Sequence, residues 1–170
     1  SILAFVKSGD HILVPDSVYD PTRTFCDEIL PAYGVSTTYY DPLIGADIST
    51  LIQNNTRLVF TEAPGSVTME VQDIPAIIKA AHDRDVIVLM DNTWATPLLF
   101  PALDYGVDVS ISAATKYISG HSDVMLGTAT ANEKCFHQLY HFSGVMGYCV
   151  GSDDLYLGLR GLRTLSVRLR

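Results

Sequence analysis

Short apolar runs rich in β-branched residues alternate along this chain with segments whose apolar residues recur at helical spacing. The runs that we expect to form strands are 11–15, 35–41, 57–62, 86–91, 108–115 and 125–131. Several are apolar at successive positions, which is typical of strands covered by helices on both faces. Strands and helices in alternating order indicate a mostly parallel sheet. The sequence therefore predicts an α/β fold, a three-layer α/β/α sandwich with a mostly parallel sheet.

We expect helices between these strands, over 22–34, 48–55, 74–85, 133–147 and 152–170. Asp47 and Asp73 each precede one of them, and a carboxylate there accepts hydrogen bonds from the free N–H groups of the first turn. Pro31 and Gly34 should end the first helix, because proline interrupts helical hydrogen bonding and glycine accepts the left-handed cap conformation.

The chain of 170 residues is acidic, with a formal net charge of −8. An acidic surface repels phosphate backbones and anionic lipids, so we expect neither nucleic acid nor a membrane as a partner. The longest aliphatic run, VIVLM at 86–90, is too short to span a bilayer. The three cysteines lack C-x-x-C spacing, which favours a reducing, cytoplasmic location over a disulfide framework.

The two ends of the sequence both have helical patterns. Residues 1–10, SILAFVKSGD, have the pattern of the tail of a helix, and residues 159–170, LRGLRTLSVRLR, that of an amphipathic helix. We therefore expect these residues to be a fragment of a longer chain.

Two residues with chemically useful side chains follow predicted strands. Asp91 closes the strand VIVLMD, and Lys116 follows the strand DVSISAAT. In an open parallel sheet, ligands bind in the crevice at the carboxyl ends of the strands. We expect Asp91 and Lys116 to approach the same crevice.

This pair of residues suits pyridoxal 5'-phosphate (PLP). A neutral lysine amine can attack the aldehyde of the cofactor, and an apolar setting near positive charge favours the neutral amine by lowering its pKa. A carboxylate beneath the ring nitrogen keeps that nitrogen protonated, so the ring can accept electrons. The hydroxyl of Thr115 can donate to the phosphate. By position alone, however, an aspartate after a strand more often caps a turn, and a lysine there is more often solvated.

Longer motifs around these residues resemble one family. DNTWATPLLFPALDYGVDVSISAATKYISGHSDVMLG (91–127) closely resembles the PLP-binding core of the Cys/Met-metabolism enzymes, a branch of the fold type I (aspartate aminotransferase-like) family. EAPGSVTMEVQDIPAI (62–77) and the S-A-A-T-K form are most similar to the bacterial cystathionine β-lyase branch. DSVYDPTRTF (16–25) and RGLRTLSVRLR (160–170) extend the resemblance over essentially the whole chain. The resemblance implies that residues 1–170 form the PLP-binding large domain of this fold.

The resemblance also implies roles for individual side chains. Lys116 would attach the cofactor covalently and act as the base at the substrate α-carbon. Asp91 would pair with the pyridine nitrogen. Tyr19, in the motif D-S-V-Y, would stack on the cofactor ring and tune the reaction through its hydroxyl. Thr115 would bind the phosphate, and Ser66 is the candidate on the substrate side.

Two positions depart from patterns common in the family. Many relatives have serine three residues before the lysine, where this chain has Ala113; Ser112 precedes it and would face the other way in a strand. One phosphate contact would therefore be missing. Relatives that act at the γ-carbon often read E-S-P-A-N-P, and Ser66 replaces the asparagine of that motif. This difference favours a β-lyase.

The implied reaction is β-elimination of cystathionine to homocysteine, pyruvate and ammonia in methionine biosynthesis. The alternatives within the family are cystathionine γ-lyase, cystathionine γ-synthase and methionine γ-lyase. The resemblance further implies a small amino-acid substrate and a homotetramer, a dimer of dimers with active sites at the dimer interface. An upstream phosphate-binding loop and a small C-terminal domain would lie outside these residues.

Other classes of function fit the sequence less well. A dinucleotide-binding oxidoreductase would share the fold, but no strand is followed by G-x-G-x-x-G, and no G-x-S-x-G hydrolase motif is present. His137 and His141 lie one helical turn apart, but no third metal ligand has a suggestive spacing, and we expect no metal. His121 is interpreted as a loop or packing residue. A non-catalytic interaction domain, with leucines along one side of 152–170, is the last alternative.

Overall fold

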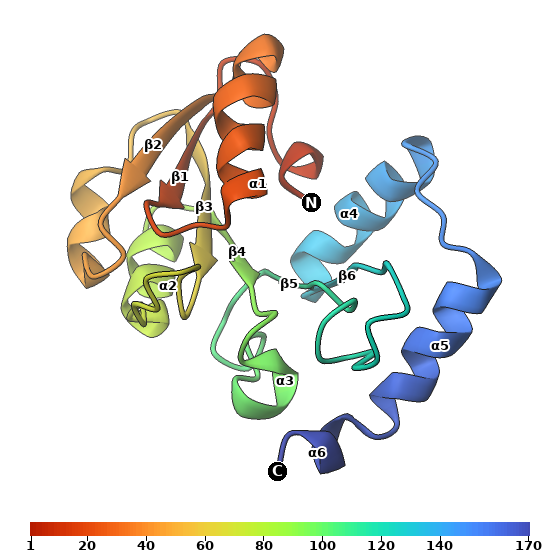
Figure 1. The fold of residues 1–170 in the computed structure, drawn as a ribbon. Coiled ribbons are helices and arrows are strands. Elements are labelled where there is room, and N and C mark those ends of the chain that lie inside the picture. The colour runs from red at the N-terminus through yellow and green to blue at the C-terminus, as the bar shows by residue number, and fades with distance from the viewer.

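A six-stranded sheet lies at the centre of the computed structural model, which describes residues 1–170 (Figure 1). The strands are β1 (His11–Pro15), β2 (Ser36–Tyr40), β3 (Thr56–Glu62), β4 (Ile87–Asp91), β5 (Val109–Ser112) and β6 (Thr128–Ala131). Their spatial order is β2-β1-β3-β4-β5-β6. All neighbours from β2 to β5 pair in parallel, and β6 pairs with β5 in the antiparallel direction. The predicted mostly parallel α/β sheet is confirmed.

The helical elements connect these strands. The α-helices are α1 (Asp20–Thr24), α2 (Ile74–His82), α3 (Thr96–Leu99), α4 (Glu133–Val145), α5 (Ser152–Leu162) and α6 (Leu165–Arg168). Short 3₁₀ or π turns are η1 (Ile2–Ala4), η2 (Phe25–Ile29), η3 (Leu30–Tyr33) and η4 (Gly45–Thr50). The turns η2 and η3 continue α1 to Gly34, whose φ of +72° is the left-handed cap conformation that glycine favours.

Some local expectations are confirmed and others are wrong. Asp73 caps α2 by accepting a hydrogen bond from the backbone N–H of Ala76 at 3.1 Å. Asp47 is not a cap, because its helix is the 3₁₀ turn η4, which begins before it at Gly45. The helix predicted over 152–170 is interrupted between α5 and α6 by residues 163–164.

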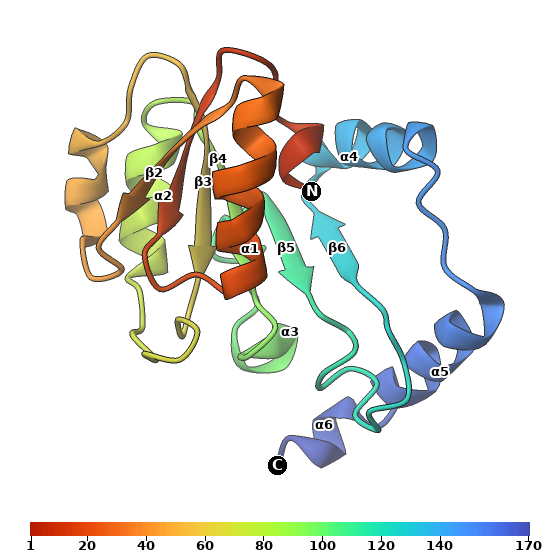
Figure 2. The same ribbon diagram turned by 45° about the horizontal axis from the view of Figure 1, so that its top comes forward.

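Two apolar clusters separate the helices into two layers. Alternate strand residues point to opposite faces of a sheet, so Leu89 belongs to one cluster while Val88 and Met90 belong to the other. The cluster with Val88 packs against α2 and η4, and the cluster with Leu89 packs against η1, η2 and α4. Figure 2 shows α1 and α2 on opposite faces of the sheet. The predicted three layers are therefore present.

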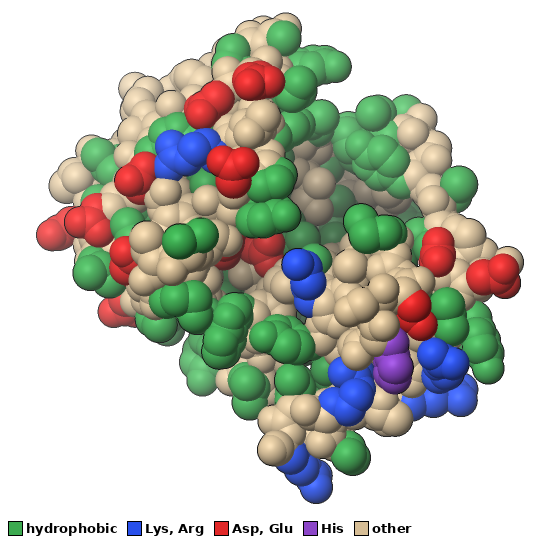
Figure 3. Space-filling model, in the orientation of Figure 1, with side chains coloured by type: hydrophobic (Ala, Val, Ile, Leu, Met, Phe, Trp, Pro, Cys, Tyr) green, Lys and Arg blue, Asp and Glu red, His purple; other side chains and the backbone are tan.

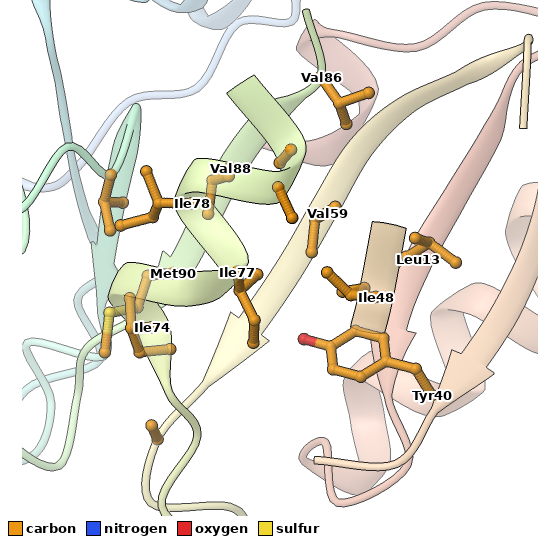
Figure 4. Packing of buried hydrophobic residues seen from close by; sticks show 14 of the residues in the cluster. Leu13, Tyr40, Ile48, Val59, Ile74, Ile77, Ile78, Val86, Val88 and Met90 are labelled. Atoms are coloured by element: carbon orange, nitrogen blue, oxygen red, sulfur yellow. The ribbon is translucent and has the colours of Figure 1, made fainter. Parts of the chain in front are cut away.

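Figure 4 shows the packing on the α2 face. Ile77 of α2, Val59 of β3 and Val88 of β4 are completely buried there. Tyr40 closes the cluster at the end of β2. Its hydroxyl lies 2.8 Å from the backbone oxygen of Phe60 and 2.9 Å from Oε1 of Gln72, either of which can accept its proton. Burial of several large side chains at this interface gives β3 and β4 a rigid position.

The edge of the sheet at which the parallel strands begin is fixed by buried polar contacts. The Asp108 carboxylate accepts hydrogen bonds from the backbone N–H of Val88 at 2.8 Å and from the side-chain amide of Asn132 at 2.8 Å, and it pairs with His82 at 2.9 Å. At β1, His11 lies between the hydroxyls of Thr56 and Thr38. These contacts join the strands at this edge, and ligands of open parallel sheets bind at the opposite edge, where the strands end.

A cavity of about 530 Å³ separates the β5–β6 end of the sheet from α5. Leu155, Leu159 and Leu162, which the sequence placed on one side of a helix, line it together with Ile118 and Leu126.

No helix of the chain combines the length and apolarity needed to cross a membrane. In Figure 3 most of the visible basic side chains gather over the region of α5 and α6, together with a few acidic ones, whereas most of the visible acidic side chains lie over the N-terminal half.

Candidate active site at the carboxyl ends of the strands

Asp91 lies at the centre of the carboxyl edge of the sheet. It is the last residue of β4 and is in register with Glu62, the last residue of β3, and with Ile111 of β5. By strand alternation, Asp91 shares the sheet face of Leu89, and Glu62 shares that of Phe60. Leu89 and Phe60 both belong to the cluster beneath α1 and α4. Both carboxylates therefore lie on the α1 side of the sheet.

Lys116 lies on the turn that follows β5. The backbone N–H of Lys116 donates to the Ala113 oxygen at 2.9 Å, and the N–H of Ala113 donates to the Thr93 hydroxyl at 2.8 Å. The N–H of Thr93 in turn donates to the Asp91 carboxylate at 2.9 Å. Three short hydrogen bonds thus link the lysine turn to the end of β4. The two segments lie at one edge of the sheet because β4 and β5 are parallel, and the approach of the two side chains to one crevice stays a prediction. β5 ends at Ser112 instead of continuing to 115 as expected.

Tyr19 and Ser66 meet at the Glu62 side chain. Glu62 is buried, and its carboxylate accepts the backbone N–H of Tyr19 at 3.0 Å and the Ser66 hydroxyl at 2.6 Å. Burial raises the pKa of Glu62, the hydrogen bonds from Ser66 and Tyr19 oppose that rise, and the charge of Asp91 adds to it. The carboxylate therefore holds the segments of Tyr19 and Ser66 beside the end of β4.

Thr115 has a different environment from the other candidates. Its hydroxyl donates to the Leu126 oxygen at 3.2 Å and accepts from the Leu126 N–H at 2.9 Å. It therefore closes the loop between β5 and β6. Binding of a phosphate by Thr115 stays a prediction, and a phosphate oxygen would have to replace the Leu126 oxygen as the acceptor of this hydroxyl.

The free groups at this edge fit PLP. Lys116 is exposed and its amine has no hydrogen bond or ion pair, so it is available for covalent attachment. One Asp91 oxygen accepts from Thr93, and the other has no partner, so it can accept from a protonated ring nitrogen. Tyr19 exposes 52 % of its surface directly before α1, which leaves an aromatic face open for stacking.

The sequence matches the family model of Cys/Met metabolism PLP-dependent enzymes over residues 1–170. The chain belongs to this family. Members of the family depend on PLP, the cofactor that the free groups at the sheet edge fit. His137 and His141 lie on α4 and have no place in this site, and the structure contains no group of three or more His, Cys, Asp or Glu residues arranged to hold a metal.

Curated relatives show where the chain stands within the Cys/Met metabolism family. It is 54 % identical to cystathionine beta-lyase MetC of Escherichia coli (strain K12), over 100 % of this chain and 44 % of that protein. It is 46 % identical to L-alanine/L-glutamate racemase of Wolbachia pipientis wMel, over 100 % of this chain and 42 % of the relative. The chain thus spans less than half the length of both proteins.

A solved structure has the same fold as this chain. The structure of cystathionine gamma-lyase from Lactobacillus plantarum, complexed with L-serine, superposes with a TM-score of 0.92 at 30 % identity. The match covers 95 % of this chain and 43 % of that one. The aspartate aminotransferase-like expectation for the fold is thereby confirmed.

Three residues of this region were missed by sequence reasoning. Glu62 holds Tyr19 and Ser66, Thr93 links Asp91 to the lysine turn, and Arg168 binds the backbone after Lys116. Glu62 and Thr93 lie in motifs that resemble the family, at or just after a predicted strand end, which is the one local signal that could have found them. Nothing local in the sequence indicates the contacts of Arg168.

Proposed function

We propose that residues 1–170 are the PLP-binding domain of a carbon–sulfur lyase. The enzyme would convert cystathionine and water to homocysteine, pyruvate and ammonia, as a step in methionine biosynthesis. The observation that carries this proposal is the 54 % identity, across the whole chain, to a cystathionine beta-lyase. The unpaired amine of Lys116 and the free Asp91 oxygen at one sheet edge support it.

The side chains at the sheet edge would divide the chemistry among them. PLP, when bound, supplies an aldehyde that condenses with amines and a ring that takes up the electrons left at the substrate α-carbon. Lys116 would hold the cofactor through Nζ and, once released by the substrate, would take the proton from the α-carbon, because its tether keeps it beside that atom. The side chain of Asp91 would hold a proton on the ring nitrogen.

The remaining candidates would orient the reactants. The ring of Tyr19 would cover one flat face of the cofactor, and its hydroxyl would be free to hydrogen-bond to the reacting groups. Thr115 would contribute to phosphate binding, and Ser66 would lie on the substrate side. Glu62 would keep Tyr19 and Ser66 in place through the two hydrogen bonds that it accepts.

A product assay on the purified full-length enzyme tests the proposed reaction. With L-cystathionine we expect pyruvate and homocysteine in equal amounts. Release of 2-oxobutyrate and cysteine would assign a γ-lyase and overturn the proposal. Conversion of L-alanine to the racemate without any keto acid from cystathionine would instead assign the activity named for the Wolbachia relative.

We also propose a homotetramer, a dimer of dimers with active sites at the dimer interface. In support, α4, α5 and the segment between them expose many large apolar side chains, a feature of surfaces that meet another chain: Phe136, Tyr140, Val145, Met146, Tyr148, Val150, Leu155 and Tyr156. We place the enzyme in the cytoplasm, which suits a chain whose cysteines, Cys26, Cys135 and Cys149, are all free.

The oligomeric state is measured directly by light scattering during size-exclusion chromatography of the full-length enzyme. We expect a mass four times that of the full-length chain at micromolar concentration. Replacing Tyr140 and Tyr148 by serine should lower that mass, because both side chains are well exposed in this chain and a tetramer would bury them. A monomeric wild-type enzyme would refute the proposed assembly.

A further inference from the structure

The C-terminal helices pack against the turn that carries Lys116. Both views of the fold show α5 and α6 running alongside the loop between β5 and β6, although α5 is separated from α4 by an extended segment (Figures 1 and 2). Arg168, on α6, contacts backbone atoms that lie 50 and 51 residues earlier in the sequence. A contact between residues so far apart in the sequence ties the loop between β5 and β6 to the C-terminal helices.

Arg168 binds the two peptide groups that follow the lysine. Its guanidinium donates from Nη1 to the Tyr117 oxygen at 2.7 Å and from Nη2 to the Ile118 oxygen at 2.9 Å. Nη2 also donates to the Gly161 oxygen at 2.8 Å, and Nε donates to the Thr164 hydroxyl at 3.0 Å. The planar, charged guanidinium therefore joins α5, α6 and the lysine turn with four hydrogen bonds, which a lysine ammonium could not reproduce.

Two glycines make room for this contact. Gly161 of α5 approaches so closely that a Cβ there would overlap the Ile118 oxygen and lie 2.6 Å from the Ser119 oxygen. Gly120, with a φ of +74°, ends the turn, and a Cβ at this position would overlap the Arg168 guanidinium. Close backbone approach at two positions is a second, independent sign that α5, α6 and the turn are fitted to one another.

We propose that Arg168 is a positioning residue for Lys116. The inference rests on the proposed attachment of the cofactor to Lys116. Thr115 fixes the loop on one side of the lysine through Leu126, and Arg168 fixes it on the other through Tyr117 and Ile118. The amine itself is unpaired, so the backbone on both sides determines where it can reach.

Loss of the Arg168 contact should impair the chemical step more than substrate binding. In the full-length holoenzyme, we expect Arg168→Gln to lower kcat by about 10- to 100-fold with little change in KM, because a displacement of the order of 1 Å in a reacting group has effects of this size. Arg168→Lys should recover part of the loss, since an ammonium can still donate to one of the two carbonyls.

Two readouts separate positioning from general destabilisation. The visible absorbance of the lysine-bound cofactor should titrate at a different pH in Arg168→Gln, and hydrogen exchange of the amides at 117–120 should accelerate. Arg163→Gln is the matched control, because Arg163 lies at the end of α5 and its side chain makes no hydrogen bond or ion pair. In the Arg163→Gln variant, the absorbance of the cofactor, the hydrogen exchange of the amides at 117–120 and kcat should equal those of the wild type.

The outcomes distinguish this inference from the proposed function. If Arg168→Gln keeps the wild-type kcat, the wild-type pH titration of the cofactor absorbance and the wild-type hydrogen exchange at 117–120, the role of Arg168 is wrong. The proposed role of Lys116 would still stand. If Arg168→Gln does not fold, Arg168→Lys decides, and wild-type values for that variant likewise overturn the inference. Cofactor attachment that survives Lys116→Ala would refute the assignment of Lys116, on which this inference rests, whereas the product assay with cystathionine tests the proposed reaction.

Discussion

Lys116→Ala in the full-length enzyme will abolish covalent attachment of PLP and reduce turnover of cystathionine by at least about a thousandfold, since the change removes both the anchor and the proposed base. The other lysines offer no substitute. Lys79 is paired with Asp83 on α2 at 2.6 Å. Lys7 precedes β1 and Lys134 lies in the first turn of α4, both toward the edge of the sheet opposite the site. Visible absorbance, together with borohydride reduction and peptide mass spectrometry, measures the attachment.

The matched control for this experiment is Lys134→Ala. Lys134 is exposed like Lys116, but β6 runs antiparallel and ends opposite Val109, the first residue of β5, so α4 begins at the edge away from the site. This variant should keep both cofactor attachment and turnover. A borohydride-fixed cofactor on any peptide other than the one containing Lys116 would overturn the assignment.

Asp91→Asn will leave the cofactor attached but lower kcat/KM for cystathionine by about a hundredfold or more, because a neutral amide no longer stabilises a proton on the ring nitrogen. The fold should survive, since the asparagine oxygen can still accept the hydrogen bond from the backbone N–H of Thr93 that Asp91 now accepts at 2.9 Å. Steady-state kinetics measure the loss, and the reduction assay with borohydride confirms that attachment persists.

A second aspartate provides the control for charge removal alone. Asp73 caps α2 by accepting from Ala76, and asparagine is an equally good cap residue. Asp73→Asn should therefore keep the kinetics of the wild type. An Asp91→Asn enzyme with unchanged kcat/KM would show that the carboxylate is not needed for the reaction, and the proposed role of Asp91 would be wrong.

The strands could be predicted because their signal is local. The runs around β1, β3 and β4 differ from the strands in the structure by at most one residue at an end, and the Asp73 cap is correct. The failures depend on tertiary contacts or on short turns. β5 stops early because the N–H of Ala113 binds the Thr93 hydroxyl, a residue 20 positions away. Asp47 lies inside a 3₁₀ turn, whose start a single acidic residue does not determine.

The candidate site likewise contains residues that the sequence could indicate and residues whose roles depend on tertiary contacts. Asp91 and Lys116 follow predicted strands, so the rule for parallel sheets places them at one edge without knowledge of their contacts. The roles of Glu62 and Arg168 rest on partners 43 and 51 residues away, Tyr19 and Tyr117. No periodicity or motif spacing in the sequence reports such pairings, and only the folded chain shows that these side chains support the candidate residues.

The side chains of β4 point alternately to the two faces of the sheet, and this alternation limits how related sequences can diverge. Val88 and Met90 face α2, whereas Leu89 faces the other layer and sets the direction of Asp91. Deletion of a single residue within this strand would reverse every following side chain and turn the carboxylate toward the wrong helices. We therefore expect insertions and deletions in related sequences to fall in the connecting loops and not within β4.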